Sequence, residues 1–253
     1  MSKIRLDKYL VDKNFFKSRN KAQIEIRAGN VYVDSTQCKK KSVKVDENNR
    51  IEIKDRFLKY VGRAALKLKK FLKGNNIDVY NKVVLDVGSS TGGFVEVLLE
   101  EGASSIIAVD VGKNQLDRKL KNNNRVEVFE NTDIRKFIKK RKEINFDIIT
   151  VDVSFISLKK IVGILKDRAE KYIFLFKPQF ETKKNKKGIV KNLELHVKLL
   201  KKFVDFLEKK GFNIKKIERS KIIGEKGNIE YFVFCSNRFI DNFDKEKIKE
   251  KVF

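Results

Sequence analysis

The sequence predicts an α/β protein in which a small α+β domain precedes a larger, doubly wound parallel sheet. Three observations support this prediction. The first 54 residues show helical spacing followed by alternating apolar residues, a charged stretch comes next, and apolar strands alternate with helices from residue 63 onward. The chain has 253 residues, which is enough for one small and one large domain, each with its own core.

The predicted first domain covers residues 1–54. Leu6, Tyr9 and Leu10 recur at helical spacing, and Ser18 stands where the N-cap of a second helix is expected, before a helical stretch that ends at Gly29. Apolar residues then alternate, which predicts a small sheet built on Val31 and Val33, Val43 and Val45, and Ile51 and Ile53. A linker is predicted at residues 55–62.

The predicted second domain covers residues 63–236, and a charged tail at 237–253 is expected to form a helix or to fray. A helix at 63–73 comes first. Strands are predicted at 82–87, 105–109, 125–129, 146–151 and 172–176, helices near 94–101, 114–121, 134–142, 157–168 and 193–210, and closing strands at 213–217 and 230–235. Because parallel strands end at one edge of the sheet, a ligand is expected at that edge.

The composition narrows the partners of the protein. The chain carries 59 Lys and Arg against 34 Asp and Glu, a formal net charge of +25, which favours polyanions. No apolar run approaches the ~20 residues that span a bilayer, and the start lacks a signal-peptide core, so we expect a cytoplasmic protein without membrane contact. With Cys38, Cys235 and His196 isolated, the sequence predicts neither a disulfide framework nor a metal site.

A glycine-rich loop follows the first strand of the second domain. Glycines let a ligand approach the backbone closely, although tight strand-to-helix turns use glycine without a ligand as well. The spacing differs from the dinucleotide fingerprint, and no Gly-Lys-Ser/Thr follows to hold a triphosphate, which disfavours a phosphate-bearing cofactor. The residues of this candidate site are Gly88, Ser89, Ser90, Thr91, Gly92, Gly93 and Phe94.

Carboxylates follow the first three strands and strengthen this prediction. Asp86 stands beside the loop, Asp110 after the second strand, and Asp133 shortly after the third. In that order they suit the cationic amino acid moiety, the ribose diol and the adenine amino group of S-adenosylmethionine. Aspartate is also an ordinary turn residue at strand ends, so the prediction depends on all three together.

Four further segments stand out: GRAALKL at 62–68, VDVSFISL at 151–158, FKPQFE at 176–181 and GNIEYF at 227–232. Asp152 and Lys177 end strands four and five, which places both beside the glycine loop. Pro178 fixes the backbone directly after Lys177. Taken alone, Lys67 and Glu230 have the pattern of a solvated lysine and a surface acid.

The runs RLDKYL and SRNKAQIEIRAGNVYVD resemble the RNA-binding domain named after ribosomal protein S-four, over residues 5–53. The resemblance implies that the helix pair presents basic side chains to structured RNA. Residues 1–60 hold 16 Lys and Arg against 8 Asp and Glu, although charge alone is also typical of a solvated face. The basic residues expected to contact RNA are Arg5, Lys8, Lys17, Arg19, Lys21, Arg27, Lys39, Lys40 and Lys41.

The chain as a whole, from residue 5 to about 235, resembles the TlyA family of ribosomal RNA ribose methyltransferases, whose catalytic domain is related to the FtsJ type. The resemblance rests on the four segments above and on DVGSSTGGF at 86–94. It implies a Rossmann-like methyltransferase domain with a catalytic tetrad at Lys67, Asp152, Lys177 and Glu230. The implied reaction is 2′-O-methylation of a cytidine ribose in ribosomal RNA, on the large subunit in preference to the small one.

The tetrad suits this reaction because a ribose hydroxyl is a poor nucleophile until a base withdraws its proton. Lysine is a base only when neutral, and burial or a neighbouring cation lowers an amine pKa from about 10.4. We therefore expect Lys67 to lie beside Lys177 and favour its neutral form, with Asp152 and Glu230 orienting the amines. Transfer from a sulfonium needs no metal.

Two other functions stay open at this stage. The chain could serve as an RNA-binding ribosome-assembly factor for which methylation is incidental. Many members of the family also carry a hemolysin label, which implies a membrane-lytic protein, but the sequence shows neither a spanning segment nor an export signal. The oligomeric state is left open.

Overall fold

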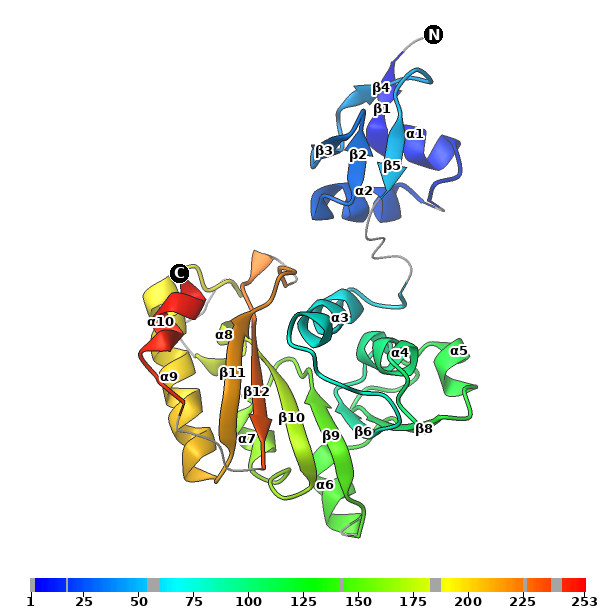
Figure 1. Cartoon of the computed structure of the whole chain (residues 1–253). Helices are drawn as coiled ribbons and strands as arrows, with labels where there is room; N and C mark the ends of the chain where they lie inside the picture. Colours follow the sequence, from blue (N-terminus) through cyan, green and yellow to red (C-terminus); the bar gives the residue numbers. More distant parts are fainter. Residues whose placement is uncertain are drawn as a thin grey trace. The chain divides into compact units, whose positions relative to one another are not determined.

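A computed structural model describes residues 3–16, 18–53, 60–141, 143–182, 188–224, 227–237 and 243–253. The chain forms two compact units, Met1–Arg63 and Ala64–Phe253 (Figure 1). Lys17 and residues 55–59 of the expected linker lie outside the described residues.

The first unit packs two helices against small sheets. Helices α1 (Leu6–Asp12) and α2 (Arg19–Ala28) accompany a three-stranded sheet of order β3-β2-β5 and a two-stranded sheet of β1 and β4. The predicted limits of the second helix are confirmed: Ser18 Oγ accepts a hydrogen bond from the Lys21 N–H, and Gly29 ends the helix at φ +77°. The strands are β1 Ile4–Arg5, β2 Val31–Val33, β3 Thr36–Cys38, β4 Lys44–Val45 and β5 Ile51–Ile53.

The second unit is built on a seven-stranded sheet of order β11-β12-β10-β9-β6-β7-β8. Strands β10, β9, β6, β7 and β8 run parallel, and β12 is antiparallel to both of its neighbours. This arrangement confirms the predicted doubly wound α/β class. The strands are β6 Val83–Val87, β7 Ser105–Val109, β8 Val126–Phe129, β9 Phe146–Val151, β10 Ala169–Phe176, β11 Asn213–Arg219 and β12 Tyr231–Ser236.

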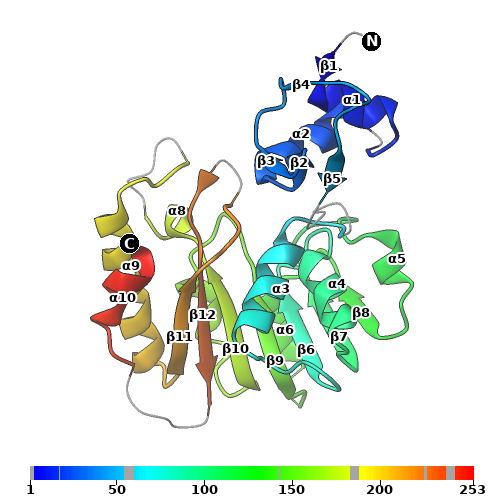
Figure 2. The ribbon, with the colours of Figure 1, turned by 45° about the horizontal axis from the view of Figure 1, so that its top comes forward.

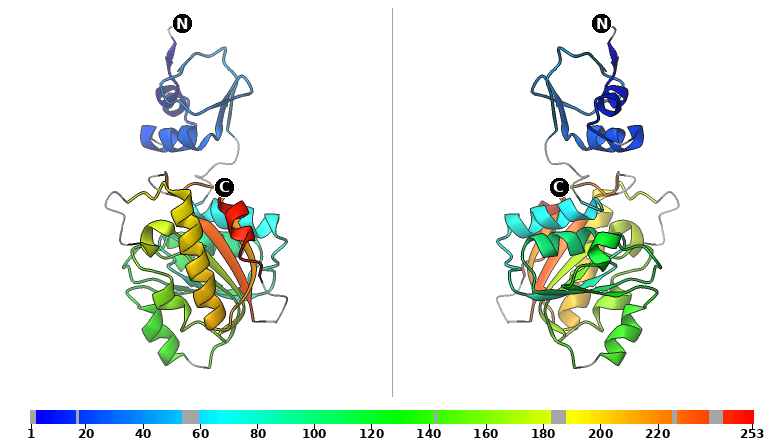
Figure 3. Two further views of the ribbon diagram at one scale, coloured as in Figure 1. Left: turned by 90° about the vertical axis from the view of Figure 1, so that its left-hand side faces the viewer. Right: turned by 90° about the vertical axis from the view of Figure 1, so that its right-hand side faces the viewer.

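Helices cover both faces of this sheet (Figures 2 and 3). Alternate strand residues such as Leu85, Ile149 and Phe174 share one core with α6 (Ile134–Lys140), α7 (Lys159–Val162), α9 (Leu193–Lys209) and α10 (Lys247–Val252). On the other face, Phe71 of α3 (Ala64–Gly74) and Phe94 of α4 (Gly93–Glu100) stack on Phe232 of β12. The remaining short helices are α5 Arg118–Lys121 and α8 Pro178–Glu181.

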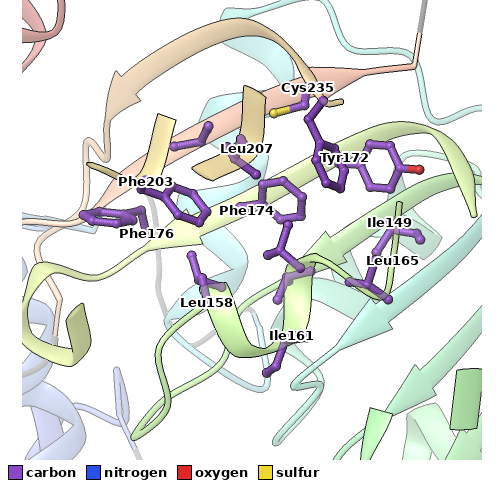
Figure 4. Packing of buried hydrophobic residues seen from close by; sticks show 14 of the residues in the cluster. Ile149, Leu158, Ile161, Leu165, Tyr172, Phe174, Phe176, Phe203, Leu207 and Cys235 are labelled. Carbon is purple, nitrogen blue, oxygen red and sulfur yellow. The ribbon is translucent and has the colours of Figure 1, made fainter. Parts of the chain in front are cut away.

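Aromatic side chains fill the core beneath α9. Every second residue of β10 points to this face of the sheet, namely Tyr172, Phe174 and Phe176. The rings of Phe203 and Phe212 contact them at centroid distances of 4.9 to 6.3 Å (Figure 4). Burying each such side chain contributes about 2 kcal/mol. This core packs against β10, the strand that Lys177 directly follows.

Two predicted helices are shorter than expected. At 114–121 only α5 forms, because the Glu130 carboxylate accepts the N–H groups of Asn114, Gln115 and Leu116 and holds that stretch as a loop. At 157–168 only α7 forms, and the chain turns at Asp167 with φ +64°. The tail forms α10 within its described residues. Among all the described helices, none has the length and apolar character needed to cross a bilayer.

Candidate active site

The glycine loop lies where the sheet reverses its order, between β6 and β9. Gly88 has φ +84°, and a Cβ at this position would lie 2.5 Å from the backbone oxygen of Asp152. Only glycine therefore allows the two strand ends to approach this closely. In doubly wound sheets this reversal point is the usual place for a ligand.

A cavity of about 490 Å³ opens at this edge. Gly88, Ser90, Asp110, Asp133 and Asp152 of the predicted site residues line it. The Asp110 carboxylate accepts hydrogen bonds from the N–H groups of Ser90 at 2.8 Å and Gly112 at 2.7 Å, so it fixes the loop. The other lining residues are Val87, Val109, Val111, Gly112, Gln115, Thr132, Ile134, Arg135, Val153, Ser154, Phe155, Ile156 and Ile161.

Asp133 lies at the start of α6, where its carboxylate accepts a hydrogen bond from the Arg135 N–H. The Arg135 guanidinium also donates to this carboxylate and holds the pKa of Asp133 down at about 2. Asp133 is therefore ionised where it faces the cavity.

Several predicted cofactor residues lie away from the cavity lining. The turn is formed by Ser89, Thr91, Gly92 and Gly93, and Gly92, at φ +98°, is the N-cap of α4. Phe94 is buried and stacks on Phe232, 6.5 Å away, so it belongs to the core.

Asp86 is the last residue but one of β6, so it lies within the strand and does not follow it. Because side chains alternate along a strand, Val87 lines the cavity while Asp86 points to the face covered by α3 and α4. Its Oδ1 accepts a hydrogen bond from Thr150 Oγ1 at 2.6 Å, and its Oδ2 has no partner among the described residues. Burial raises the pKa of Asp86 to about 7.

Asp152 and Lys177 meet at the ends of adjacent strands. Lys177 Nζ lies 2.5 Å from Asp152 Oδ1 and donates a hydrogen bond to Ser154 Oγ at 3.0 Å. Both ionic side chains are nearly buried, and Asp152 lines the cavity. A carboxylate and a hydroxyl that both line the cavity thus hold the lysine amine.

Lys67 and Glu230 form a second pair. Lys67 Nζ donates to Glu230 Oε2 at 2.7 Å, and both side chains are buried. Gly224 leaves room for this carboxylate, because a Cβ there would lie 2.2 Å from Glu230 Oε1. Each of the two carboxylates thus pairs with one of the two amines, Glu230 with Lys67 and Asp152 with Lys177.

The register of the sheet brings the two pairs to the same edge. Phe176 of β10 is opposite Tyr231 of β12, so Lys177 follows one strand where Glu230 precedes the other. All four residues of the expected tetrad thus gather at the edge that carries the cavity.

Phe155 is a site residue that sequence reasoning missed. Its side chain is 93% exposed, it lines the cavity, and its ring lies 5.2 Å from that of Phe180. Its backbone has φ +66°, which is uncommon for an aromatic residue. The segment VDVSFISL drew attention to Asp152, but nothing in it signals an exposed aromatic ring.

Two of the predicted basic residues of the first unit, Arg5 and Arg19, contact a buried carboxylate. Asp7 accepts hydrogen bonds from the guanidinium groups of Arg5 and Arg19 and from Gln23, which also accepts from Lys41 Nζ. The Arg5 guanidinium and its partners hold the pKa of Asp7 well below its usual range. The other predicted basic residues that the structure describes, Lys8, Lys21, Arg27, Lys39 and Lys40, are exposed.

Family models match both units of the chain. The FtsJ-like methyltransferase model matches residues 60–237, and the S4 domain model matches residues 4–51. The fold and the site therefore define a methyltransferase with an RNA-binding type of domain at its N-terminal end.

Curated relatives and a solved structure agree with this class. The chain is 47% identical to the 23S rRNA (cytidine-2′-O)-methyltransferase TlyA of Campylobacter jejuni, over 69% of this chain and 70% of that protein. It is 40% identical to Hemolysin A of Brachyspira hyodysenteriae, over 90% of this chain and 98% of that protein. A solved structure described as a hemolysin from Streptococcus thermophilus matches with a TM-score of 0.74 and 34% sequence identity. The match covers 100% of this chain and 95% of that one. The chain belongs to the TlyA family of FtsJ-like methyltransferases.

Proposed function

We propose that this protein transfers a methyl group from S-adenosylmethionine to the 2′-oxygen of a cytidine in ribosomal RNA, of the large subunit in preference to the small one. In this proposal residues 1–54 bind the RNA and residues 63–236 carry out the transfer. The observation that carries the proposal is the Lys177 amine, held at the cavity edge by Asp152 and Ser154. The name of the Campylobacter relative supports the choice of cytidine and of the large subunit.

The donor set of the cavity fits S-adenosylmethionine. Asp110 and Asp133 offer carboxylates to the hydroxyl and amine donors of an adenosine, and Gly88 lets a ligand approach the backbone. We leave Asp86 out of this contact set because its side chain points away from the cavity. When bound, the cofactor supplies a methyl group on a cationic sulfur that departs as a neutral thioether.

The residues of the chain would activate the ribose. The amine of Lys177 accepts the proton of the 2′-hydroxyl as the oxygen attacks the methyl group, and the Asp152 carboxylate stabilises the ammonium that forms. Glu230 orients Lys67, whose ammonium donates to the ribose oxygen while negative charge develops there. The exposed ring of Phe155 offers a surface on which the base of the flipped nucleotide can stack.

The test is transfer of a labelled methyl group from S-adenosylmethionine to large and small ribosomal subunits and to their naked RNAs, followed by nucleoside mapping. Lys177→Ala should lower the labelling of cytidine ribose by about 10²- to 10⁴-fold while cofactor affinity is retained. Lys73→Ala, a change of an exposed lysine on α3, serves as the control.

Two outcomes would overturn the proposal. Full activity of the Lys177→Ala variant would remove the lysine from the chemistry. Cofactor binding without labelling of any of these RNAs would favour the assembly-factor role, and leakage of liposomes by the purified protein would favour a lytic role.

A further inference from the structure

The two segments that supply Asp152 and Lys177 are joined by a second carboxylate. Glu181 is the last residue of α8 and lies four residues after Lys177. Its Oε2 accepts a hydrogen bond from Ser157 Oγ at 2.6 Å, and its Oε1 accepts one from the Leu158 N–H at 2.7 Å. Both donors belong to the loop 152–158 that begins with Asp152.

We propose that Glu181 is a positioning residue for methyl transfer. Through its two hydrogen bonds it holds the loop 152–158 against the segment 177–181, and so keeps Lys177 at Asp152 and Phe155 at the cavity mouth. This inference rests on the proposed function and deepens it, because Glu181 would act through residues that face the substrate.

Further contacts between the same two segments support this role. Lys177 Nζ bonds Ser154 Oγ, and the ring of Phe155 contacts that of Phe180. The bond from Glu181 to the Leu158 N–H closes the loop at its far end. Phe155, which would touch the substrate, thus lies between two contacts with the segment 177–181, one at Ser154 and one at Leu158.

The conformation of Phe155 calls for such an anchor. An exposed aromatic residue at φ +66° gains little from burial, so its left-handed backbone persists only where the surroundings impose it. Glu181 is not among the residues that line the cavity. Its effect must therefore pass through the position of the loop.

The chemistry of the acceptor allows a graded test. A carboxylate accepts from both donors at once, whereas Glu181→Gln keeps one oxygen for the Leu158 N–H and can donate to Ser157 Oγ from its amide. Glu181→Ala loses both bonds. The exposed Glu194 at the start of α9 provides a matched control, since Glu194→Ala removes a carboxylate from the same unit.

The experiment measures methylation kinetics and cofactor affinity of the full chain. We expect Glu181→Ala to lower kcat about 10- to 100-fold with cofactor Kd unchanged, Glu181→Gln to recover most of that loss, and Glu194→Ala to match the wild type. Ser157→Ala should lower kcat less in the Glu181→Ala background than in the wild type, because the bond that the two residues share is already lost there. Wild-type kcat in Glu181→Ala, or equal losses in the Ala and Gln variants, would overturn the inference.

Hydrogen exchange of the loop 152–158 separates this inference from the proposed function. Faster exchange there in Glu181→Ala than in Glu194→Ala supports the anchor even if the wild type methylates none of the tested RNAs, a result that would refute the proposed function alone. Unchanged exchange in Glu181→Ala would overturn the inference even if the wild type is active.

Discussion

Asp7 of the first unit and Asp86 of the second are both fully buried carboxylates, yet their pKa values shift in opposite directions. Asp7 is bonded by the guanidinium groups of Arg5 and Arg19, which hold its pKa well below the usual range. Asp86 receives one hydroxyl, from Thr150, and burial raises its pKa to about 7. The charge of the partners, and not burial alone, therefore decides whether a buried carboxylate stays ionised.

Each unit carries a reporter for its own stability. Cys38 is buried in the core of the first unit and Cys235 in the core of the second, and both are free thiols. A brief pulse of a thiol reagent at increasing urea concentrations therefore follows the unfolding of each unit separately.

The largest effect is expected for Asp7→Asn. The amide leaves two guanidinium groups beside a buried site without their counter-charge, which should lower the free energy of unfolding of the first unit by about 3 kcal/mol. The urea concentration at the midpoint of Cys38 labelling should fall, and the midpoint of Cys235 labelling should remain unchanged. Asp12→Asn, a change of an exposed carboxylate on the same helix, is the control, and equal Cys38 midpoints in the two variants would refute the role of Asp7.

The second expected effect is the pH dependence caused by Asp86. Between pH 5 and 7 the folded state keeps a proton that the unfolded state has lost, so the stability of the second unit falls as pH rises and levels off above pH 7. The free energy of unfolding of the second unit should fall by about 2 kcal/mol between pH 5 and pH 7 because of Asp86. This fall should disappear in Asp86→Asn.

The matched measurement isolates Asp86 from the buried His196. Desolvation lowers the pKa of His196, and this effect is present in both proteins. The difference between wild type and Asp86→Asn in Cys235 midpoints from pH 5 to 8 therefore reports on Asp86. Parallel pH curves for the two proteins would contradict the raised pKa.

The smallest effect is expected for Thr150→Val. Loss of the one hydroxyl that Asp86 receives should destabilise the second unit by about 1 kcal/mol at pH 8, where Asp86 is ionised, and by less at pH 5. The pH at which stability levels off should also move upward, because an unbonded carboxylate ionises less readily. Cys235 labelling across the same pH range checks both effects, and an unmoved pH curve would count against the hydrogen bond.

Local patterns predicted much of the fold. The strand predictions at 105–109 and 146–151 coincide with β7 and β9, because buried parallel strands carry short apolar runs. The helix predicted at 114–121 failed over its first half because Glu130 captures three N–H groups of that stretch from the end of another strand. No local sequence pattern predicts hydrogen bonds to a carboxylate that lies 14 to 16 residues further along the chain.

The sequence by itself determined that Asp110, Asp152 and Lys177 reach one edge of the sheet, because the carboxyl ends of parallel strands meet there. Only the tertiary structure decided how their neighbours pair. Lys67 and Glu230 are 163 positions apart and meet because α3 packs on β12. The spacing of apolar residues along the chain is a local property, whereas this ion pair depends on the packing of elements that are far apart in the sequence.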